Sequence, residues 1–412
     1  MGKNVALLHY SAPPVVGGVE SVLAHHAGLL AEAGHVVRVL AGRGQPWAAN
    51  IPFIHLPLAD SRHPDIMASK SELDAGRVPS EFEALTERLA EALRAAAAGC
   101  DLLIAHNVCS LNKNLPLTAA LHRLSSRPGF PRLVLWHHDL AWTTPRFAAE
   151  LHPGYPWDLL RTHWPGVTHV VVSEERRREL ASLLGLAPDR IRVAPNGVDA
   201  MTFLKLEAQT QALVRRLDLL HAAPVLLLPV RITPRKNIEL ALHTLAALRG
   251  QPGGAEARLV VTGPLGPHSP GNADYFAQLK ARRVQLGLEQ SAHFLAEHSD
   301  AYLPDAVIAD FFRLADVLFL PSREEGFGIP LLEAAFSRRP VFCADIPALR
   351  ELGRADAVYF SPDADPAELA ALVAGRLHTD QVYQFAVRAR AGYTWERIYA
   401  AHLEPLLTEA GT

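Results

Sequence analysis

The stretch "NVALLHYSAPPVVGGVESVLAHHAGLLAEAGHVVRVLAG", residues 4–42, decides the fold class. The apolar run at 4–9 is typical of a buried strand, residues 19–34 repeat apolar side chains at helical spacing, and 35–42 is again strand-like. Gly34 stands where a glycine commonly ends a helix. The order strand, helix, strand predicts a βαβ unit, and a βαβ unit implies a parallel sheet.

The same alternation continues along the chain in two series. "DLLIAH", "RLVLWHHD" and "HVVVSEE" extend the first series, and a Pro-Asn-Gly turn at 195–197 ends it. "APVLLLPV", "ARLVVTGP", "DVLFLPS" and "RPVFCAD" form the second. We therefore predict an α/β protein of two Rossmann-like doubly wound domains that face a central cleft, at residues 1–200 and 201–390. Residues 391–412 include an amphipathic helix that we predict to pack back across both domains.

The composition restricts the classes of partner. The chain has 412 residues, of which 49% are hydrophobic and 20% charged, which is enough for two cores. Its formal net charge of -3, from 40 basic and 43 acidic residues, provides no global basic field for nucleic acid or anionic lipid. We expect no nucleic-acid partner, and the oligomeric state stays open.

The cysteines and the N-terminus indicate the compartment. Three cysteines without a CxxC spacing favour a reducing environment and argue against disulfides or a zinc site. The N-terminus enters a strand-like run without a signal-peptide pattern, and no apolar run of about 18 residues could span a bilayer. We predict a cytoplasmic protein without stable membrane insertion.

Ligands of parallel sheets bind beyond the carboxyl ends of the strands, so candidate residues should follow strands. Gly17 and Gly18 follow the first strand and could let backbone amides approach a phosphate, although an ordinary βα turn explains them equally well. Their spacing is not GxGxxG, which argues against a dinucleotide dehydrogenase.

Two cations follow the first strand of the second series. Arg231 ends "VLLLPVR", and Lys236 comes five residues later, before a helix whose N-cap could be Asn237. A forked guanidinium and a mobile ammonium suit a diphosphate, whose negative charge grows as a nucleoside diphosphate departs. A solvated basic loop is the alternative reading, and we assign Arg235 to it.

The segment "SREEGFGIPLLEAA", from Ser322 to Ala335, places a glycine loop between two carboxylates. It follows the strand "DVLFLP", and Pro330 suits the first turn of a helix. Glu333 could accept hydrogen bonds from ribose hydroxyls, and Glu325 could face the sugar on the second phosphate. Alternatively, Glu325 belongs to a solvated acidic pair and Glu333 interacts only with the helix dipole.

In the first half, His137, His138 and Asp139 end an apolar strand. Polar residues just beyond a buried run are costly unless they meet a ligand or one another. Neighbouring side chains on a strand point to opposite faces, so we expect only one of the two histidines in the cleft. His106 and Asn107 end a neighbouring strand and could line the same cleft. Two adjacent histidines chelate metals poorly, and we predict no metal site.

These residues resemble the retaining GT-B-fold glycosyltransferases of family 4, the group 1 glycosyltransferases. The resemblance covers nearly the whole chain, and it rests on these segments: "GGVE" at Gly17, "HHD" at His137, "VVSE" at Val171, "PNGVD" at Pro195, "RITPRKN" at Arg231, "VTGP" at Val261, "EEGFGIPLLEA" at Glu324, and the terminal "YTWERIYAAHL". One departure is Pro229, where a glycine-containing strand end is common in the family.

The resemblance implies a nucleotide-sugar donor in the C-terminal domain, an acceptor in the N-terminal domain, and transfer with retention and without a metal. The catalytic set that it implies is His138, Glu325, Arg231 and Lys236. The donor-binding set is Gly17, Gly18, Arg231, Lys236, Gly263, Glu325, Gly326, Phe327, Gly328, Ile329 and Glu333. Front-face attack is expected, with the leaving diphosphate taking the acceptor's proton, so Glu325 is assigned no nucleophilic role.

The acceptor is predicted from the polar and aromatic loops of the first domain. Asn107, Asp139 and Trp142 are the candidate acceptor-binding residues, and Lys113, Arg146, Tyr155 and Arg161 lie in the same loops. Packing within the loops is the alternative reading. No basic amphipathic helix stands out for a lipid acceptor, so we expect a small polar molecule such as a sugar or a glycerate derivative.

The sequence thus predicts a metal-independent retaining hexosyltransferase that needs no cofactor. Its co-substrate would be a nucleotide sugar such as GDP-mannose or UDP-glucose, so mannose or glucose is transferred. Two alternatives remain open, a sugar phosphorylase and a non-catalytic nucleotide-sugar-binding protein on the same fold.

Overall fold

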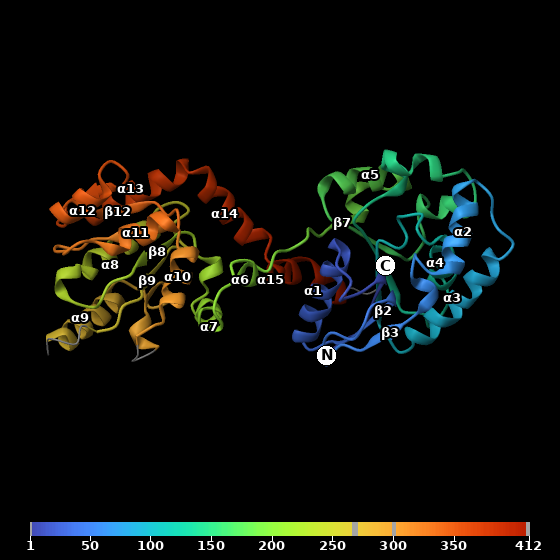
Figure 1. The fold of residues 1–412 in the computed structure, drawn as a ribbon, viewed down its shortest axis with the longest axis horizontal. Coiled ribbons are helices and arrows are strands. Elements are labelled where there is room, and N and C mark those ends of the chain that lie inside the picture. The colour runs from blue at the N-terminus through green and yellow to red at the C-terminus, as the bar shows by residue number, and fades with distance from the viewer. Residues whose placement is uncertain (1, 266–270, 299–301, 409–412) are drawn as a thin grey trace. The chain divides into compact units, whose positions relative to one another are not determined.

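The computed structural model describes residues 2–265, 271–298 and 302–408, and it divides into two compact units (Figure 1). Unit 1 comprises Met1–Val198 and Tyr393–Thr412, and unit 2 comprises Asp199–Gly392. The C-terminal segment from Tyr393 onward belongs to unit 1.

Unit 1 is built on a parallel seven-stranded sheet with the order β3-β2-β1-β4-β5-β6-β7. The strands are β1 (Asn4–Ser11), β2 (Val36–Arg43), β3 (Phe53–His55), β4 (Leu102–His106), β5 (Arg132–His137), β6 (Thr168–Val171) and β7 (Ile191–Val193). The strand order reverses between β1 and β4, and this reversal is the switch point at which doubly wound sheets bind ligands.

Alternate residues of these strands face two different cores. Leu8 and Leu103 belong to a cluster with α3 (Phe82–Ala96) and α4 (Leu115–Ser125). Leu7 and Ile104 belong to a second cluster with α1 (Gly18–Glu32) and the C-terminal segment. Both faces of the sheet are thus covered, which explains why its strands are continuous apolar runs.

Unit 1 has further helices between its strands and at its C-terminal end. They are α2 (Pro64–Asp74), α5 (Glu174–Leu184), α15 (Trp395–Ile398) and α16 (Glu404–Thr408), with a π-helical turn at Tyr399–Leu403 before α16. Helix α1 ends as predicted, because Gly34 follows it with a φ of 87°, a conformation that favours glycine.

Unit 2 is a second parallel sheet, of six strands in the order β10-β9-β8-β11-β12-β13. The strands are β8 (Val225–Leu228), β9 (Arg258–Val261), β10 (Ala292–Phe294), β11 (Val317–Leu320), β12 (Val341–Ala344) and β13 (Val358–Phe360). Its switch point lies between β8 and β11.

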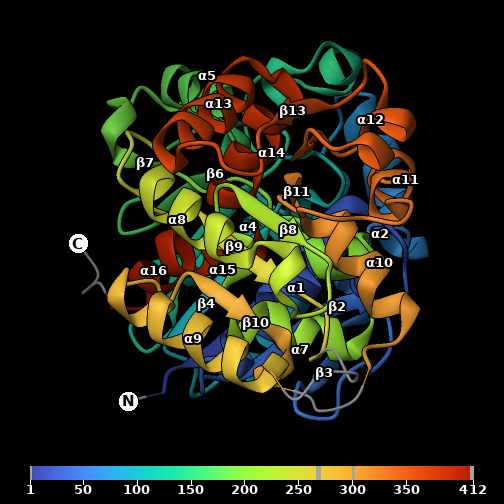
Figure 2. The same cartoon turned by 90° about the vertical axis from the view of Figure 1, so that its left-hand side faces the viewer.

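Helices cover both faces of the second sheet. They are α6 (Ala200–Phe203), α7 (Ala208–Arg216), α8 (Ile238–Arg249), α9 (Gly271–Gln285), α10 (Asp305–Leu314), α11 (Ile329–Phe336), α12 (Pro347–Gly353), α13 (Pro366–Thr379) and α14 (Gln381–Gly392). Figure 2 shows α8, α9 and α13 on one side of the strands and α10, α11 and α12 on the other. Unit 2 is thus doubly wound, as predicted.

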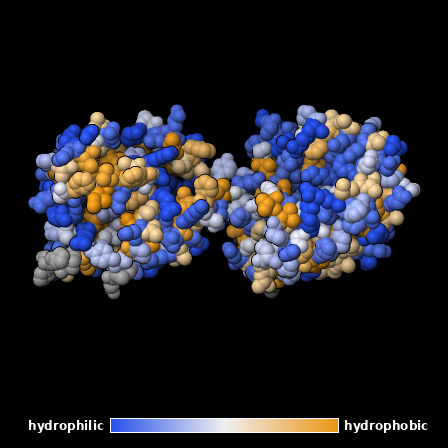
Figure 3. Space-filling view, viewed as in Figure 1, coloured by the Kyte–Doolittle hydropathy of each residue, from blue (hydrophilic) through white to orange (hydrophobic). Residues whose placement is uncertain are grey.

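The surfaces of both units mix polar and apolar residues in the view of Figure 3. Within the described residues, no helix combines the length and the apolar character needed to cross a bilayer. Cys109 and Cys343 are buried and Cys100 is half-buried, and all three are free thiols.

Candidate active site

The loops after β8 and β11 meet at the switch point of unit 2. The Lys236 ammonium donates a hydrogen bond of 2.5 Å to Oε1 of Glu325, across 89 positions of the sequence. The side chains are only 8% and 9% exposed, so this is a buried ion pair. Two residues that the sequence analysis placed in the donor site are therefore in direct contact.

Burial and the hydrogen bond of this pair shift the pKa of Lys236 in opposite directions. Burial lowers the pKa of Lys236 from the ordinary lysine value, and the hydrogen bond that its ammonium donates to Glu325 opposes that shift. An ammonium has three donors, so it can hold this carboxylate and a further anion at the same time. Arg235 is half exposed and its guanidinium donates to the backbone oxygen of Glu324, as expected of a surface cation.

Arg231 and Gly263 are neighbours at the ends of β8 and β9. The Arg231 side chain is exposed, and its guanidinium carbon lies 5.5 Å from the centre of the Tyr302 ring. A Cβ on Gly263 would come within 2.1 Å of the Val230 oxygen and 2.6 Å of the Arg231 nitrogen. Gly263 is therefore required for the close backbone approach that positions Arg231.

The glycine loop before α11 has one strained position. Gly328 is the N-cap residue of α11 with a φ of 99°, and a Cβ there would lie 2.6 Å from a methyl group of Leu349. Around Gly326 no described atom lies within 4 Å of a Cβ position, and Phe327 and Ile329 are exposed. A side chain would thus clash at Gly328, whereas the space beside Gly326 is open.

Glu333 lies on α11, one turn beyond this loop, and Pro330 is in the first turn as predicted. Burial raises the pKa of the Glu333 carboxyl, and the charge of Asp305 adds to the shift. A partly buried carboxylate beside a second acidic group is stabilised by hydrogen-bond donors, which ribose hydroxyls could supply.

Asn237 occupies the N-cap position of α8, as predicted. Its φ is 53°, and its side chain makes no capping hydrogen bond to the helix. The carboxamide donates instead to the backbone oxygens of Pro321, at 3.1 Å, and Pro362, at 2.8 Å. Asn237 therefore joins the loops after β8, β11 and β13, a role that its helix-start position concealed.

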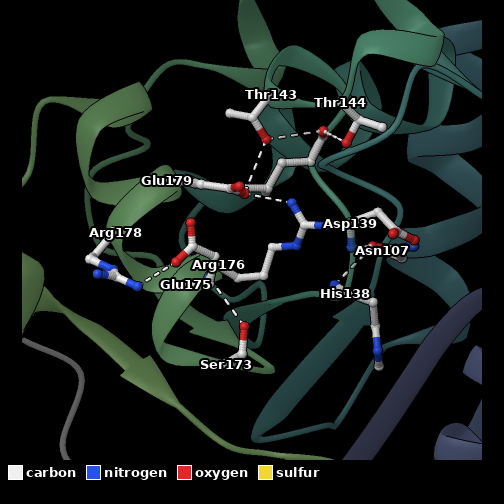
Figure 4. Close-up of polar contacts among 11 residues, drawn as sticks. Asn107, His138, Asp139, Thr143, Thr144, Ser173, Glu175, Arg176, Arg178 and Glu179 are labelled. Atoms are coloured by element: carbon white, nitrogen blue, oxygen red, sulfur yellow. Dashed lines mark hydrogen bonds and ion pairs between the residues drawn. The ribbon is translucent and has the colours of Figure 1, made fainter.

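In unit 1, three of the predicted residues meet where β4 and β5 end. The Asn107 carboxamide oxygen accepts hydrogen bonds from the backbone amides of His138 and Asp139, both at 3.0 Å. Its nitrogen donates to the Asp139 carboxylate at 3.3 Å. In Figure 4 the His138 ring and the Asp139 carboxylate leave this turn in different directions.

The two adjacent histidines contact different neighbours. Nε2 of His137 lies 3.1 Å from Nδ1 of His169 in the core, whereas Nε2 of His138 lies 3.4 Å from Nδ1 of His106. His137 is buried, and His138 is half-buried. The two rings therefore contact different neighbours, and His138 is the more exposed of the two.

Gly17 and Gly18 begin α1 and differ in what surrounds them. A Cβ on Gly17 would lie 2.1 Å from the carboxylate of Glu20, whereas on Gly18 it would meet no described atom within 4 Å. The Glu20 carboxylate accepts the Ser11 hydroxyl at 2.6 Å and lies 4.0 Å from Nε2 of His9. The sequence analysis missed His9, Ser11 and Glu20, whose only signal was their place beside the glycine pair.

Trp142, a predicted acceptor contact, is engaged within its own loop. Its indole nitrogen donates to the Trp157 oxygen at 3.2 Å, and the Arg161 guanidinium covers one face of the ring at 4.0 Å. Arg146 likewise lies over Phe147, and the Tyr155 hydroxyl donates to Glu83. For these side chains the structure supports the alternative reading of loop packing.

Helix α5 contributes a polar network that the sequence analysis did not assign. The Glu179 carboxylate accepts from the Thr143 hydroxyl at 3.1 Å and from the Arg176 guanidinium at 2.5 Å (Figure 4). Ser173 caps the helix by accepting from the Arg176 amide. Glu179 thus joins α5 to the loop after β5. In the sequence, this loop directly follows the turn at His138.

Acid should destabilise unit 1. Burial lowers the pKa of His9 and His138 to about 4, and that of His26 to about 3. Unfolded histidines titrate near 6.5, so these rings contribute stability above that pH and lose it as the pH falls towards 4. Each contributes a slope of up to about 1.4 kcal/mol per pH unit.

All six tryptophans belong to unit 1, so their fluorescence reports its unfolding alone. We expect a lower urea midpoint at pH 5 than at pH 7.5. An equal or higher midpoint at pH 5 would contradict the lowered pKa values.

Among the described residues, no three His, Cys, Asp or Glu side chains gather as a set that could hold a metal ion. The chain forms two doubly wound α/β units, each with polar side chains at the carboxyl edge of a parallel sheet, which is the architecture of the GT-B fold. Residues 16–201 match the family model Glycosyltransferase Family 4, and residues 212–390 match Glycosyl transferases group 1. The chain belongs to the group 1 glycosyltransferases.

Several proteins of known name are similar to this chain. Mannosylglucosylglycerate synthase of Petrotoga mobilis is 26% identical over 266 residues, which are 61% of each chain. D-inositol 3-phosphate glycosyltransferase of Geodermatophilus obscurus is 31% identical over 232 residues, 55% of this chain and 49% of that protein. The matches thus span about half to three fifths of these relatives. The solved sucrose-phosphate synthase of Thermosynechococcus elongatus aligns with 98% of this chain and 99% of its own at 17% identity, with a TM-score of 0.38.

Proposed function

We propose that this protein transfers a hexose, mannose or glucose, from a GDP- or UDP-linked sugar to a hydroxyl of a small polar acceptor, with retention and without a metal. The observation that carries the proposal is the buried Lys236–Glu325 pair at the switch point of unit 2. A desolvated ammonium beside a glycine loop provides what a departing diphosphate needs.

The chemistry follows from this arrangement. The acceptor oxygen bonds to the anomeric carbon as the bond from that carbon to the diphosphate oxygen breaks. The departing diphosphate takes the acceptor's proton, so no protein nucleophile is needed. Lys236 and Arg231 stabilise the negative charge that grows on the leaving group, and the amides of the Gly326–Gly328 loop add to that stabilisation.

The other predicted residues take supporting roles in this proposal. Glu325 contacts hydroxyls of the donor sugar while it orients Lys236, and Glu333 binds the ribose. His138 contacts the reacting sugar. Gly17 and Gly18 leave backbone amides open to the phosphates, and Asp139 contacts the acceptor.

The acceptor class is supported by the names of the relatives. One name contains a glycosylated glycerate and the other inositol 3-phosphate, and both molecules are small, polar and anionic. We propose an acceptor of this size, bound by unit 1. We also propose that the protein acts in the cytoplasm.

The test is a panel of GDP- and UDP-linked sugars with small hydroxylated acceptors, assayed for release of nucleoside diphosphate with and without a chelator. We expect release that depends on the acceptor, that survives chelation, and that gives a product with the donor's anomeric configuration. Phosphorolysis of a glycoside by inorganic phosphate would favour a sugar phosphorylase. Nucleotide-sugar binding without turnover would favour a non-catalytic protein.

Replacing Glu333 with alanine should weaken donor binding more than it slows turnover. The variant loses the hydrogen bonds that ribose hydroxyls would donate to the Glu333 carboxylate. Hydrogen bonds to a charged group contribute about 1.5–3 kcal/mol, or roughly a 10- to 100-fold change in the Kd of the donor. Calorimetric titration with the nucleoside diphosphate measures the change. The matched control is Glu324→Ala, because Glu324 is exposed. Equal affinities for both variants would remove Glu333 from the ribose site.

A further inference from the structure

Two polar residues at the end of β4, His106 and Asn107, both contact the segment around His138. Asn107 has a φ of 60°, a left-handed conformation that asparagine tolerates better than most residues. Its side-chain oxygen accepts from the amides of His138 and Asp139 and from the Ser110 hydroxyl at 3.2 Å. A buried oxygen with three donors is fully engaged, so Asn107 is better explained as a structural element of the turn than as an acceptor contact.

These hydrogen bonds determine the direction of the His138 side chain. Two successive amides that converge on one oxygen fix the orientation of their peptide planes, and therefore of the bond from Cα to Cβ of His138. The backbone amide of Asn107 itself donates to the Trp136 oxygen at 2.7 Å. The turn is thus anchored to the strand that carries His138.

His106 contacts the ring of the same histidine. Its Nδ1 lies 3.4 Å from Nε2 of His138, and the ring centres are 5.7 Å apart. Burial lowers the pKa of both rings, so both are neutral at neutral pH. Between two neutral imidazoles, one nitrogen must donate and the other accept. The contact therefore selects a tautomer for each ring.

The surroundings of His106 favour one of the two assignments. Its Nε2 is buried without a hydrogen-bond partner among the described residues, and so is the indole nitrogen of Trp136, 5.5 Å away between ring centres. The indole is a donor only, which an unprotonated Nε2 complements through a buried water. His106 then carries its proton on Nδ1 and donates it to His138.

We propose that His106 and Asn107 are positioning residues for His138, with Asn107 fixing the direction of its side chain and His106 holding it as the Nδ1–H tautomer. His138 therefore presents an N–H donor to an oxygen of the reacting sugar. This inference rests on the proposed function for its catalytic consequence, but the tautomer itself can be observed without turnover.

The first test is spectroscopic. Two-bond proton–nitrogen correlation spectra of histidine-labelled protein, with His138→Gln to assign the signal, report which nitrogen of His138 carries the proton. We expect Nδ1–H in the wild type and a shift towards Nε2–H in His106→Phe, which keeps an aromatic ring without nitrogen. His106→Asn, whose amide can occupy the place of Nδ1, should restore the wild-type tautomer. Nε2–H in the wild type overturns the inference, whether or not the variants fold.

The second test is kinetic. His106→Phe and Asn107→Gly, which keeps the left-handed backbone, should lower kcat about 10- to 100-fold, as small misplacements do, with donor Kd within twofold. His106→Asn should recover most of the loss. Normal kcat in the two disruptive variants of an active enzyme overturns the inference and leaves the proposed function standing. An inactive wild type whose His138 has the expected tautomer refutes the function and leaves the positioning in place.

Discussion

Lys236→Ala should lower kcat by about 30- to 1,000-fold, which corresponds to the ~2–4 kcal/mol typical of a lost charge-stabilising group. The reason is the geometry of the buried pair, in which the ammonium is desolvated and held 2.5 Å from Glu325. Because the ammonium is already held in place, the site does not have to rearrange when the diphosphate departs. The measurement is single-turnover kinetics with saturating donor, which separates the chemical step from binding.

Arg235→Ala is the matched control for this variant. Arg235 lies one residue earlier in the same loop, but its side chain is about half exposed. We expect its kcat to stay within about threefold of the wild type, since solvent screens an exposed charge. If Lys236→Ala retained the wild-type rate, the diphosphate would lie elsewhere. If Arg235→Ala were equally slow, general positive charge and not the buried pair would explain the effect.

Asp316→Ala should destabilise unit 2 by about 3–5 kcal/mol, because it breaks a buried ion pair and leaves a charge without its partner. Asp316 is 5% exposed, and its carboxylate accepts two hydrogen bonds from Arg390, at 3.0 and 2.9 Å. It also accepts from the Val225 amide at 2.8 Å, at the start of β8. One carboxylate thus joins the first strand of the unit to its last helix.

Urea denaturation followed by far-UV circular dichroism measures this effect. With m-values of about 1–3 kcal/mol per molar urea, we expect the transition of unit 2 to move down by more than about 1 M. The tryptophan fluorescence of unit 1 is the internal control and should keep its midpoint. Asp345→Ala is the matched variant, because Asp345 makes the same forked contact with Arg350 at the exposed surface. It should leave both midpoints nearly unchanged.

Local pattern was sufficient to predict the two sheets. Buried parallel strands are continuous apolar runs, and in crossover helices apolar residues recur every three to four positions. The strand "NVALLH" and the helix after it can therefore be recognised without tertiary information. The carboxyl ends of parallel strands meet at one edge, so Lys236 and Glu325 could be expected near each other, although 89 positions separate them.

The sequence did not identify the partners of individual side chains. Asn237 stands at the predicted helix start, and its side chain donates to two loops that are 84 and 125 positions away. Trp142, a predicted acceptor contact, interacts with Arg161 and Trp157 of its own loop. Neither partner can be inferred from local spacing, because loops of this length are packed by contacts that depend on the whole unit.

The sequence by itself determined the parallel α/β architecture, the strand ends that carry polar residues, and the glycine loop of the proposed donor site, because periodicity and residue type act locally. Only the tertiary structure decided how those residues pair. It buried Lys236 against Glu325, engaged Asn107 with the His138 turn, and placed His106 beside the ring of His138. Hydrogen-bond geometry and burial depend on strand order and packing, which bring together residues that are far apart in the chain.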